Sequence, residues 1–230
     1  MTFHGFQKMT LLDFPGKVAC TLFTGGCNFR CPFCHNAGLV LEPGKWEAYE
    51  GDEVLAFLKK RQGLLDGVCI TGGEPLMHPD LPDFIREVKK LGFLVKLDTN
   101  GSFPSRLKEL VAEGLLDYVA MDIKNSRDKY PLTVGVPDYD VVPVEESVKF
   151  LLSGKVDFEF RTTVVQEFHT VEDIQDIGAW ILGTPRYFLQ NFVDSGALIG
   201  EGMTPISPEI LDKMKKSLVE YGVPTELRGL

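Results

Sequence analysis

The amino-acid sequence predicts an α/β fold, a partial (β/α)6 TIM-like barrel, and two observations support this. Predicted strands alternate with predicted helices along the 230 residues, which implies parallel strands with helices outside them. Successive strands run directly into unusual sequences, GGC, GGEP and DTNG, and in barrel-like folds the carboxyl ends of many strands build the site. A doubly wound sheet would instead concentrate its glycines in one G-x-G-x-x-G turn, which this sequence lacks.

Each predicted strand is a short apolar run, and each predicted helix places apolar side chains on one face. The strands are expected at residues 18–24, 68–71, 93–98, 118–123, 158–165 and 186–192. The helices are expected at residues 52–60, 81–91, 104–113 and 144–152, from about 170 onward, and at 208–221. Asp80 and Ser207 are expected N-caps, and Thr170 with Asp173 predicts a capping box. No composition break marks a linker, so residues 1–230 are expected to form one domain with a cysteine loop at 25–36 and a C-terminal helix at about 207–222.

The composition is that of an ordinary globular protein, with 44% apolar and 25% charged residues. No apolar run reaches the length of a membrane span, and the start MTFHGFQKMT lacks a signal-peptide pattern, so we expect a cytoplasmic protein without a membrane partner. The formal net charge of −9 and the lack of a basic stripe argue against a nucleic-acid partner. In a reducing compartment, cysteines are better interpreted as metal ligands or catalytic groups than as disulfides.

Three of the five cysteines, Cys27, Cys31 and Cys34, lie within the segment GGCNFRCPFCHN. Thiolates bind soft metals and iron–sulfur clusters. A closed zinc site takes four protein ligands, whereas three cysteines on a four-iron cluster leave one iron open. A zinc site completed by His35 is the alternative, although adjacent ligands at 34 and 35 would be geometrically awkward. Cys20 lies in an apolar strand, as does Cys69, and both are expected in the core.

Two further motifs carry glycines and carboxylates. Gly72 and Gly73 permit close backbone approach, and the carboxylate of Glu74 can pair with an ammonium group. Asp98 and Asp122 end neighbouring strands, so they would repel each other unless a cation or Lys124 neutralised them. Three histidines, at positions 4, 78 and 169, have no informative spacing and are expected at the surface.

The cysteine spacing resembles that of the radical S-adenosylmethionine (SAM) enzymes. The segment from Lys8 to Asn36 is similar to the N-terminal segment of glycyl-radical-enzyme activating enzymes, above all the anaerobic ribonucleoside-triphosphate reductase activating proteins. The resemblance covers the N-terminal two thirds of the chain well and implies a barrel of the radical SAM type. It also implies that the three cysteines ligate a [4Fe-4S] cluster whose fourth iron is chelated by SAM. The chain lacks the eight-cysteine insert of some activating enzymes, so one cluster is expected.

The resemblance implies roles for further residues. Phe33 and His35 would lie near the adenine of SAM, and Gly72, Gly73 and Glu74 would hold its methionine end. Asp98, Thr99 and Asp122, with the carbonyl of Ala120, would bind a monovalent cation beside the SAM carboxylate. Lys124 completes the D-x-K match, and Arg161 stands where the family often places a basic residue near SAM. Gln190 or Asn191 would replace a histidine that contacts the ribose in some relatives.

The implied activity is reductive cleavage of SAM to a 5′-deoxyadenosyl radical, which abstracts hydrogen from a backbone glycine of a partner glycyl radical enzyme. Anaerobic ribonucleoside-triphosphate reductase is the expected partner, and a flavodoxin or ferredoxin is the expected electron donor. Alternatives within the enzyme class are an activase of pyruvate formate-lyase or another glycyl radical enzyme, or a radical SAM enzyme acting on a small molecule or peptide, such as a 7-carboxy-7-deazaguanine synthase relative. The non-enzyme alternative is a metal-binding interaction module.

Overall fold

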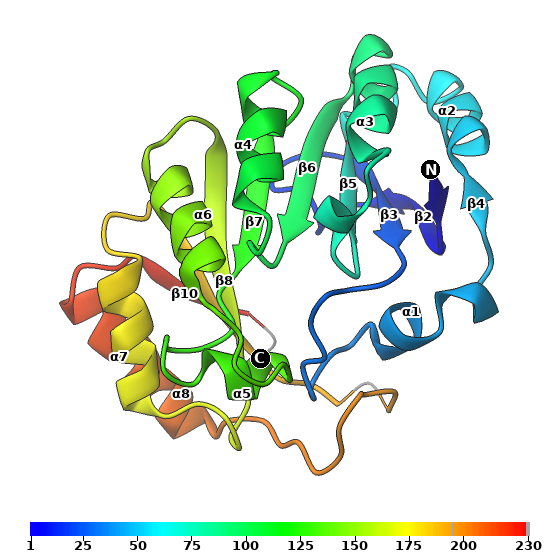
Figure 1. The fold of residues 1–230 in the computed structure, drawn as a ribbon. Helices are drawn as coiled ribbons and strands as arrows, with labels where there is room; N and C mark the ends of the chain where they lie inside the picture. Colours follow the sequence, from blue (N-terminus) through cyan, green and yellow to red (C-terminus); the bar gives the residue numbers. More distant parts are fainter. Residues whose placement is uncertain (195, 229–230) are drawn as a thin grey trace.

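One eight-stranded sheet organises the backbone (Figure 1). The computed structural model describes residues 1–194 and 196–228. In sheet order the strands are β10 (Thr225–Arg228), β9 (Tyr187–Asn191), β8 (Asp157–Val164), β7 (Tyr118–Asp122), β6 (Leu94–Thr99), β5 (Gly67–Gly72), β3 (Ala19–Thr24) and β2 (Gly5–Thr10). Neighbouring strands from β3 to β10 are parallel, whereas β2 runs antiparallel to β3.

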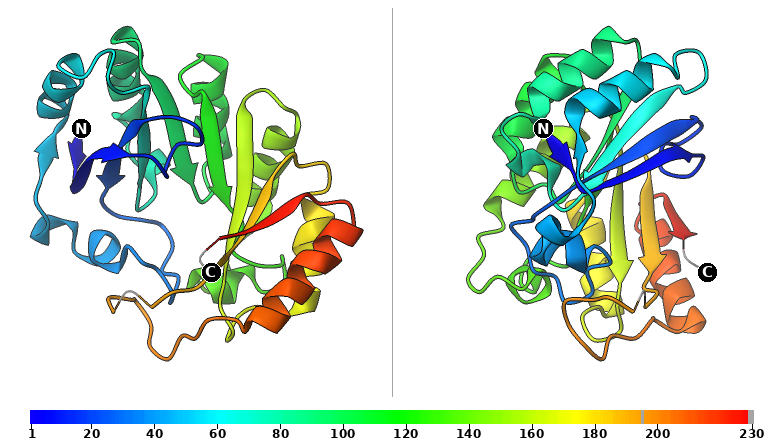
Figure 2. Two further views of the ribbon diagram at one scale, coloured as in Figure 1. Left: turned by 180° about the vertical axis from the view of Figure 1, so that it is seen from behind. Right: turned by 90° about the vertical axis from the view of Figure 1, so that its right-hand side faces the viewer.

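The sheet curls into part of a barrel, with helices on its outer face and an open inner face (Figures 1 and 2). Because the strands from β3 to β10 point the same way, their C-terminal ends meet at one rim. β2 and β10 are the edges of the described sheet, so the barrel remains open on one side. The predicted partial (β/α)6 barrel is therefore confirmed.

The helices lie between the strands along the chain, and the longer ones pack on the outer face (Figure 2). The longer helices are α2 (Gly51–Lys59), α3 (Leu81–Lys90), α4 (Pro104–Ala112), α6 (Val142–Leu152), α7 (Val171–Trp180) and α8 (Pro208–Glu220). The shorter elements are α1 (Ala37–Leu41), α5 (Tyr130–Val134), the 3-10 turns Pro43–Lys45 and Pro75–Met77, and the two-stranded ribbon of β1 (Thr2–Phe3) and β4 (Tyr49–Glu50). None of the helices in the described ranges has the length and apolar character needed to cross a bilayer.

The core lies between the outer face of the sheet and the helices. Successive side chains of a strand point to opposite faces, so one set of alternate residues faces the helices. In β6 these residues are Val95 and Leu97, both fully buried in the main apolar cluster. The other set, which includes Lys96 and Asp98, faces the inside of the barrel. The inner face is therefore free to carry polar and charged groups.

All three predicted N-cap residues begin their helices, and two of them make the side-chain capping hydrogen bond. At α7 the predicted capping box is present, because Thr170 accepts a hydrogen bond from the Asp173 N–H and the Asp173 side chain accepts one in return. At α8 the Ser207 hydroxyl accepts from the Ile210 N–H. Asp80 is the N-cap residue of α3 as predicted, but its carboxylate makes no capping hydrogen bond and lies 3.0 Å from the N-terminal ammonium group instead.

Several elements are additional to those predicted: β1, β2, β4, β10, α1 and α5. In β2 the sequence GFQKMT has few apolar residues because the strand lies at an edge and leaves much of its surface in solvent. β10 is a short edge strand that begins directly after Pro224. Short edge strands lack the apolar runs on which strand predictions rest.

Candidate active site

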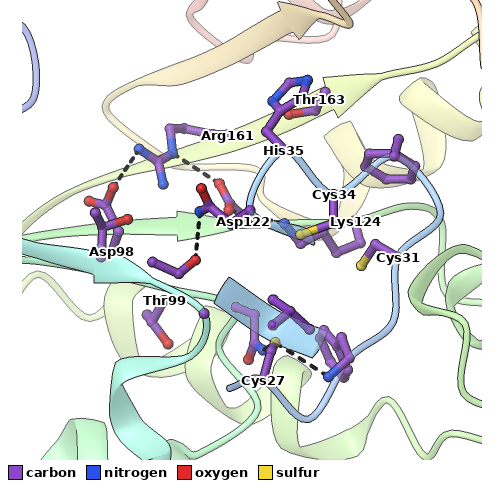
Figure 3. Close-up of a pocket in the computed structure, with 18 of the residues that line it drawn as sticks. Cys27, Cys31, Cys34, His35, Asp98, Thr99, Asp122, Lys124, Arg161 and Thr163 are labelled. Carbon is purple, nitrogen blue, oxygen red and sulfur yellow. Dashed lines mark hydrogen bonds and ion pairs between the residues drawn. The ribbon is translucent and has the colours of Figure 1, made fainter. Parts of the chain in front are cut away.

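The C-terminal ends of the strands surround a cavity of about 260 Å³, shown in Figure 3. Side chains from the cysteine loop and from the ends of β5, β6, β7, β8 and β9 meet in it. The predicted residues that line it are Cys27, Cys31, Phe33, Cys34, His35, Gly72, Gly73, Asp98, Thr99, Asp122, Lys124, Arg161 and Gln190. The fold thus brings together motifs that lie far apart in the sequence.

The cysteine loop is fixed to its surroundings by backbone and amide contacts. The Arg30 N–H donates to the Val134 carbonyl at 2.8 Å, and the Asn36 side chain donates to the Gly72 carbonyl at 2.7 Å. Asn28 donates to the Ser102 hydroxyl at 3.0 Å. These contacts join the loop to α5 and to the ends of β5 and β6, so the three thiols have defined positions before any ligand binds.

All five cysteines are free thiols, and three of them face the cavity. Burial raises the pKa of the Cys27 thiol to about 11 and that of Cys31 to about 12, and it also raises the pKa of Cys34. The charge of Lys124 acts in the opposite direction on all three. A bound iron that takes the place of the proton would relieve the cost of burying each thiolate.

The spacing of the thiols fits a cluster better than a single ion. Within the described ranges, no three His, Cys, Asp or Glu side chains are placed to hold one metal ion. A [4Fe-4S] cluster uses a different iron for each cysteine, so its ligands need not converge on one point. His35 Nε2 lies 2.8 Å from the Val193 carbonyl, and its ring stacks on Phe192 at 5.6 Å. This placement gives no support to a zinc site completed by His35.

The two glycine turns touch each other. The Gly73 N–H donates to the Thr24 carbonyl, and the Glu74 N–H donates to the Gly26 carbonyl, each at 2.9 Å. A Cβ atom at Gly73 would lie only 1.7 Å from the Gly26 carbonyl oxygen. Gly72 has a φ of +112°, which favours glycine. The glycines therefore allow the turn after β5 to pack against the turn after β3, in addition to lining the cavity.

Glu74 is fully buried and is not among the cavity-lining residues. Its carboxylate accepts hydrogen bonds from the Thr99 hydroxyl at 2.8 Å, from the Asn100 N–H at 2.7 Å and from the Leu76 N–H at 3.0 Å. Burial raises its pKa to about 7, although these hydrogen bonds act to lower it. The structure thus gives Glu74 a positioning role between β5 and β6, and its predicted contact with the SAM amino group stays a prediction.

Asp98 and Asp122 flank the guanidinium of Arg161 (Figure 3). Arg161 Nη1 lies 3.2 Å from Asp98, Arg161 Nε lies 2.9 Å from Asp122, and Lys124 Nζ lies 3.0 Å from Asp122. Burial alone would raise the carboxyl pKa values, but the cations outweigh it. The pKa of Asp98 is lowered, and that of Asp122 is lowered to about 2. Both carboxylates are therefore charged at neutral pH.

A monovalent cation at these residues is not favoured by the donor set. Both oxygens of each carboxylate already contact a cationic side chain. The predicted fourth ligand, the carbonyl of Ala120, belongs to a β7 residue that is fully buried in the sheet and does not line the cavity. The two carboxylates are therefore already neutralised by protein cations.

The remaining predicted contacts are placed as follows. Phe33 lines the cavity while packing against Phe168 at 5.7 Å. Gln190 lines the cavity, whereas Asn191 exchanges two 3.0 Å hydrogen bonds with the Ile206 backbone and is held away from it. The geometry therefore leaves Gln190 as the available side chain on β9, and its contact with a ribose stays a prediction.

The structure adds site residues that sequence reasoning did not single out. Thr163 and Asn100 line the cavity, and the Asn100 amide lies 3.7 Å from Cys27 Sγ. Lys96 lies below the cavity against Asp98. The prediction that His169 is a surface residue is wrong, because it is 3% exposed and its Nε2 lies 2.8 Å from the Lys124 carbonyl. For Lys96 the sequence did offer a signal, because residues two apart in a strand, such as Lys96 and Asp98, point to the same face of the sheet.

Comparisons with known proteins place this geometry in context. A family described as the radical SAM superfamily matches residues 21–181. A Methanocaldococcus jannaschii protein, assigned as a glycyl-radical enzyme activating enzyme, is 33% identical over 82% of this chain and 78% of its own length. The pyruvate formate-lyase 1-activating enzyme of Escherichia coli K12 is 30% identical over 95% of both chains.

Solved structures agree at the level of the fold. A radical SAM methyltransferase from Sphaerobacter thermophilus has a TM-score of 0.75 at 14% identity, covering 96% of this chain and 68% of that one. A domain of a pyruvate-formate lyase-activating enzyme from Bacteroides vulgatus has a TM-score of 0.58 at 17% identity, covering 71% of this chain and 99% of that domain.

Proposed function

The chain belongs to the radical SAM superfamily and is a radical SAM enzyme, and we propose that it activates a glycyl radical enzyme, namely anaerobic ribonucleoside-triphosphate reductase. The observation that carries the proposal is the meeting of the three cysteines with the Asp98, Asp122 and Arg161 group around one cavity. Catalysis would need both the cysteine ligands and a polar site for SAM, and a simple metal-binding module would need only the first.

The family implies a [4Fe-4S] cluster and SAM, and the residues present fit both. Cys27, Cys31 and Cys34 would hold the cluster, and the polar strand ends opposite them would hold SAM. Together the bound cluster and SAM would supply the one-electron chemistry by which SAM is cleaved to methionine and 5′-deoxyadenosine and a hydrogen atom is removed from the partner's glycine. A flavodoxin or ferredoxin would supply the electron.

The chain's own residues would bind and orient these groups. Arg161 and Lys124 provide positive charge for the SAM carboxylate, Phe33 and His35 provide ring surfaces for the adenine, and Gln190 provides an amide for the ribose. Glu74 would act through Thr99 and Asn100 by fixing the end of β6. The walls of the cavity would keep water from the radical.

The partner assignment rests on three kinds of support. Of two relatives similar to this chain over most of its length, one is named as a glycyl-radical enzyme activating enzyme and the other as a pyruvate formate-lyase activating enzyme. The resemblance of the segment from Lys8 to Asn36 to the reductase-activating group, noted from the sequence, favours the reductase over pyruvate formate-lyase. The open side of the barrel between β2 and β10 suits a protein loop as substrate.

We also propose that residues 1–230 act as one domain in the cytoplasm, where a reducing environment preserves free thiols.

The test is anaerobic reconstitution with iron and sulfide, followed by reduction in the presence of SAM. Formation of 5′-deoxyadenosine is expected, and its absence with an intact cluster would contradict catalysis. Incubation with the anaerobic reductase should then give a glycyl-radical EPR doublet. A doublet with pyruvate formate-lyase but none with the reductase would show that the partner is wrong while the chemistry is right.

A further inference from the structure

A buried lysine stands directly below the candidate SAM site. Lys96 lies on β6 two residues before Asp98, so the two side chains share the inner face of the barrel. Lys96 is 2% exposed, and its ammonium group forms an ion pair with Asp98 Oδ1 and lies 3.8 Å from Cys69 Sγ. A lysine this buried is rare without a specific partner. Its placement therefore calls for a role in the charge arrangement of the site.

Together, three protein cations contact all four carboxylate oxygens of the aspartate pair. Lys96 contacts Oδ1 of Asp98, and Arg161 contacts Oδ2. Arg161 also contacts Oδ1 of Asp122, and Lys124 contacts Oδ2. An added metal ion would have to share these oxygens with the protein cations, and it would add charge to a group that already has more cations than carboxylates.

The charge excess is one positive unit, because three cations face two carboxylates. Next along the inner face, Glu159 is itself paired, accepting hydrogen bonds from Tyr118 and Arg228. Among the side chains that directly contact Asp98 and Asp122, positive charge is therefore in excess. It suits a carboxylate, such as that of SAM, better than a second cation.

We propose that the ammonium group of Lys96, with the guanidinium of Arg161, takes the place of a bound monovalent cation, so that SAM binds to this chain without sodium or potassium. An alkylammonium group carries the same charge as a potassium ion and presents three N–H donors to oxygen atoms. The described residues offer no acceptor to Arg161 Nη2, which leaves that group for the SAM carboxylate. The inference rests on the proposed SAM site but not on the identity of the partner enzyme.

The deciding measurement uses the reconstituted holoenzyme. SAM is titrated while the EPR signal of the reduced cluster is followed, once in potassium chloride and once in tetramethylammonium chloride of equal ionic strength, because tetramethylammonium is too large for a metal site. For the wild type the two dissociation constants should agree within about threefold. A larger gain of affinity in potassium would overturn the proposal, and this arm needs no variant.

A variant removes the ammonium charge. Lys96→Met should bind SAM at least about tenfold more weakly in tetramethylammonium chloride and should recover most of the loss in potassium chloride. Lys89→Met is the matched control, because Lys89 also pairs with an aspartate, Asp117 at 2.6 Å, but lies outside the cavity. It should behave as the wild type. A Lys96→Met protein that binds SAM tightly without potassium would show that Lys96 has no such role.

An independent readout does not need the loaded enzyme. Thallium(I), a potassium mimic, should show no saturable NMR line broadening with the wild-type apoprotein, and it should show such broadening with Lys96→Met. Saturable broadening with the wild type that disappears in Asp98→Asn would overturn the proposal. Neither experiment contains a partner protein, so a failure of the reductase assignment leaves both results interpretable.

Discussion

Replacing Gly73 by alanine tests whether the turn after β5 and the turn after β3 are packed as described. The new Cβ would lie 1.7 Å from the Gly26 carbonyl oxygen, whereas real contacts of this kind are not closer than 3.0 Å. The two turns must therefore separate by more than about 1 Å, because packed interiors have no free space at such contacts. Gly26 directly precedes Cys27, so the movement would displace the first cysteine of the loop.

The magnitude follows from the contacts that would be lost. Overpacking of a well-packed position costs about 1–3 kcal/mol. The hydrogen bonds from the Gly73 N–H to Thr24 and from the Glu74 N–H to Gly26 each contribute about 1 kcal/mol. We therefore expect Gly73→Ala to lower the free energy of unfolding of the apoprotein by about 4 kcal/mol.

The assay is denaturant unfolding of the apoprotein, combined with the iron content after reconstitution. Gly44→Ala is the matched control, because a Cβ atom at Gly44 would meet nothing within 4 Å. The control should unfold and bind iron as the wild type does. If Gly73→Ala loses less than about 1 kcal/mol and binds iron normally, the two turns do not support each other and the reasoning is refuted.

The remaining predictions concern the metal, the acid stability and the loop contact. Cys31→Ala should lose the cluster, measured as bound iron and sulfide, whereas Cys20→Ala, on the outer face of the sheet, should keep it at a cost of about 1 kcal/mol in stability. Because the folded-state pKa of Asp122 lies below its ordinary value, at about 2, its stabilising effect is complete above about pH 4 and is lost as the pH falls toward 2. Because the Asp122 side chain is about a third exposed, its ion pairs contribute about 1–2 kcal/mol to the free energy of unfolding. Asp122→Asn should therefore make the free energy of unfolding less dependent on pH between about pH 4 and pH 2. An unchanged dependence on pH would count against the ion pairs. His35→Ala should lose about 1 kcal/mol of stability through its lost contacts with Phe192 and Val193 yet retain iron, and loss of the metal would instead identify His35 as a ligand.

The architecture could be predicted because its signals are local. A strand such as β6 is a mostly apolar segment that leads into DTNG, and parallel strands bring such endings to one rim. Because Cys27, Asp98 and Asp122 follow or end three such strands, the sequence alone predicts that they lie together at this rim. The edge strand β2 carried no such signal, because its side chains face solvent.

The charge arrangement could not be predicted in the same way. Arg161 on β8 reaches Asp98 on β6 across a single intervening strand, β7. The sequence does not reveal this contact, because the order of strands in a sheet is a tertiary property. Lys96 resembles an exposed strand lysine in sequence, and its burial depends on the curvature of the barrel. His169 had the same difficulty, since its contact with the Lys124 carbonyl joins residues 45 positions apart.

The carboxylate of Glu74 has a consequence for how this enzyme can vary. It joins the turn after β5 to Thr99 and Asn100, residues 25 and 26 positions away in the chain. A substitution of Glu74 leaves the buried Thr99 hydroxyl and the buried Asn100 N–H without their acceptor. The loss of stability therefore depends on whether Thr99 is substituted as well. We expect the two motifs to show strong epistasis, with a double substitution tolerated better than the sum of the single ones.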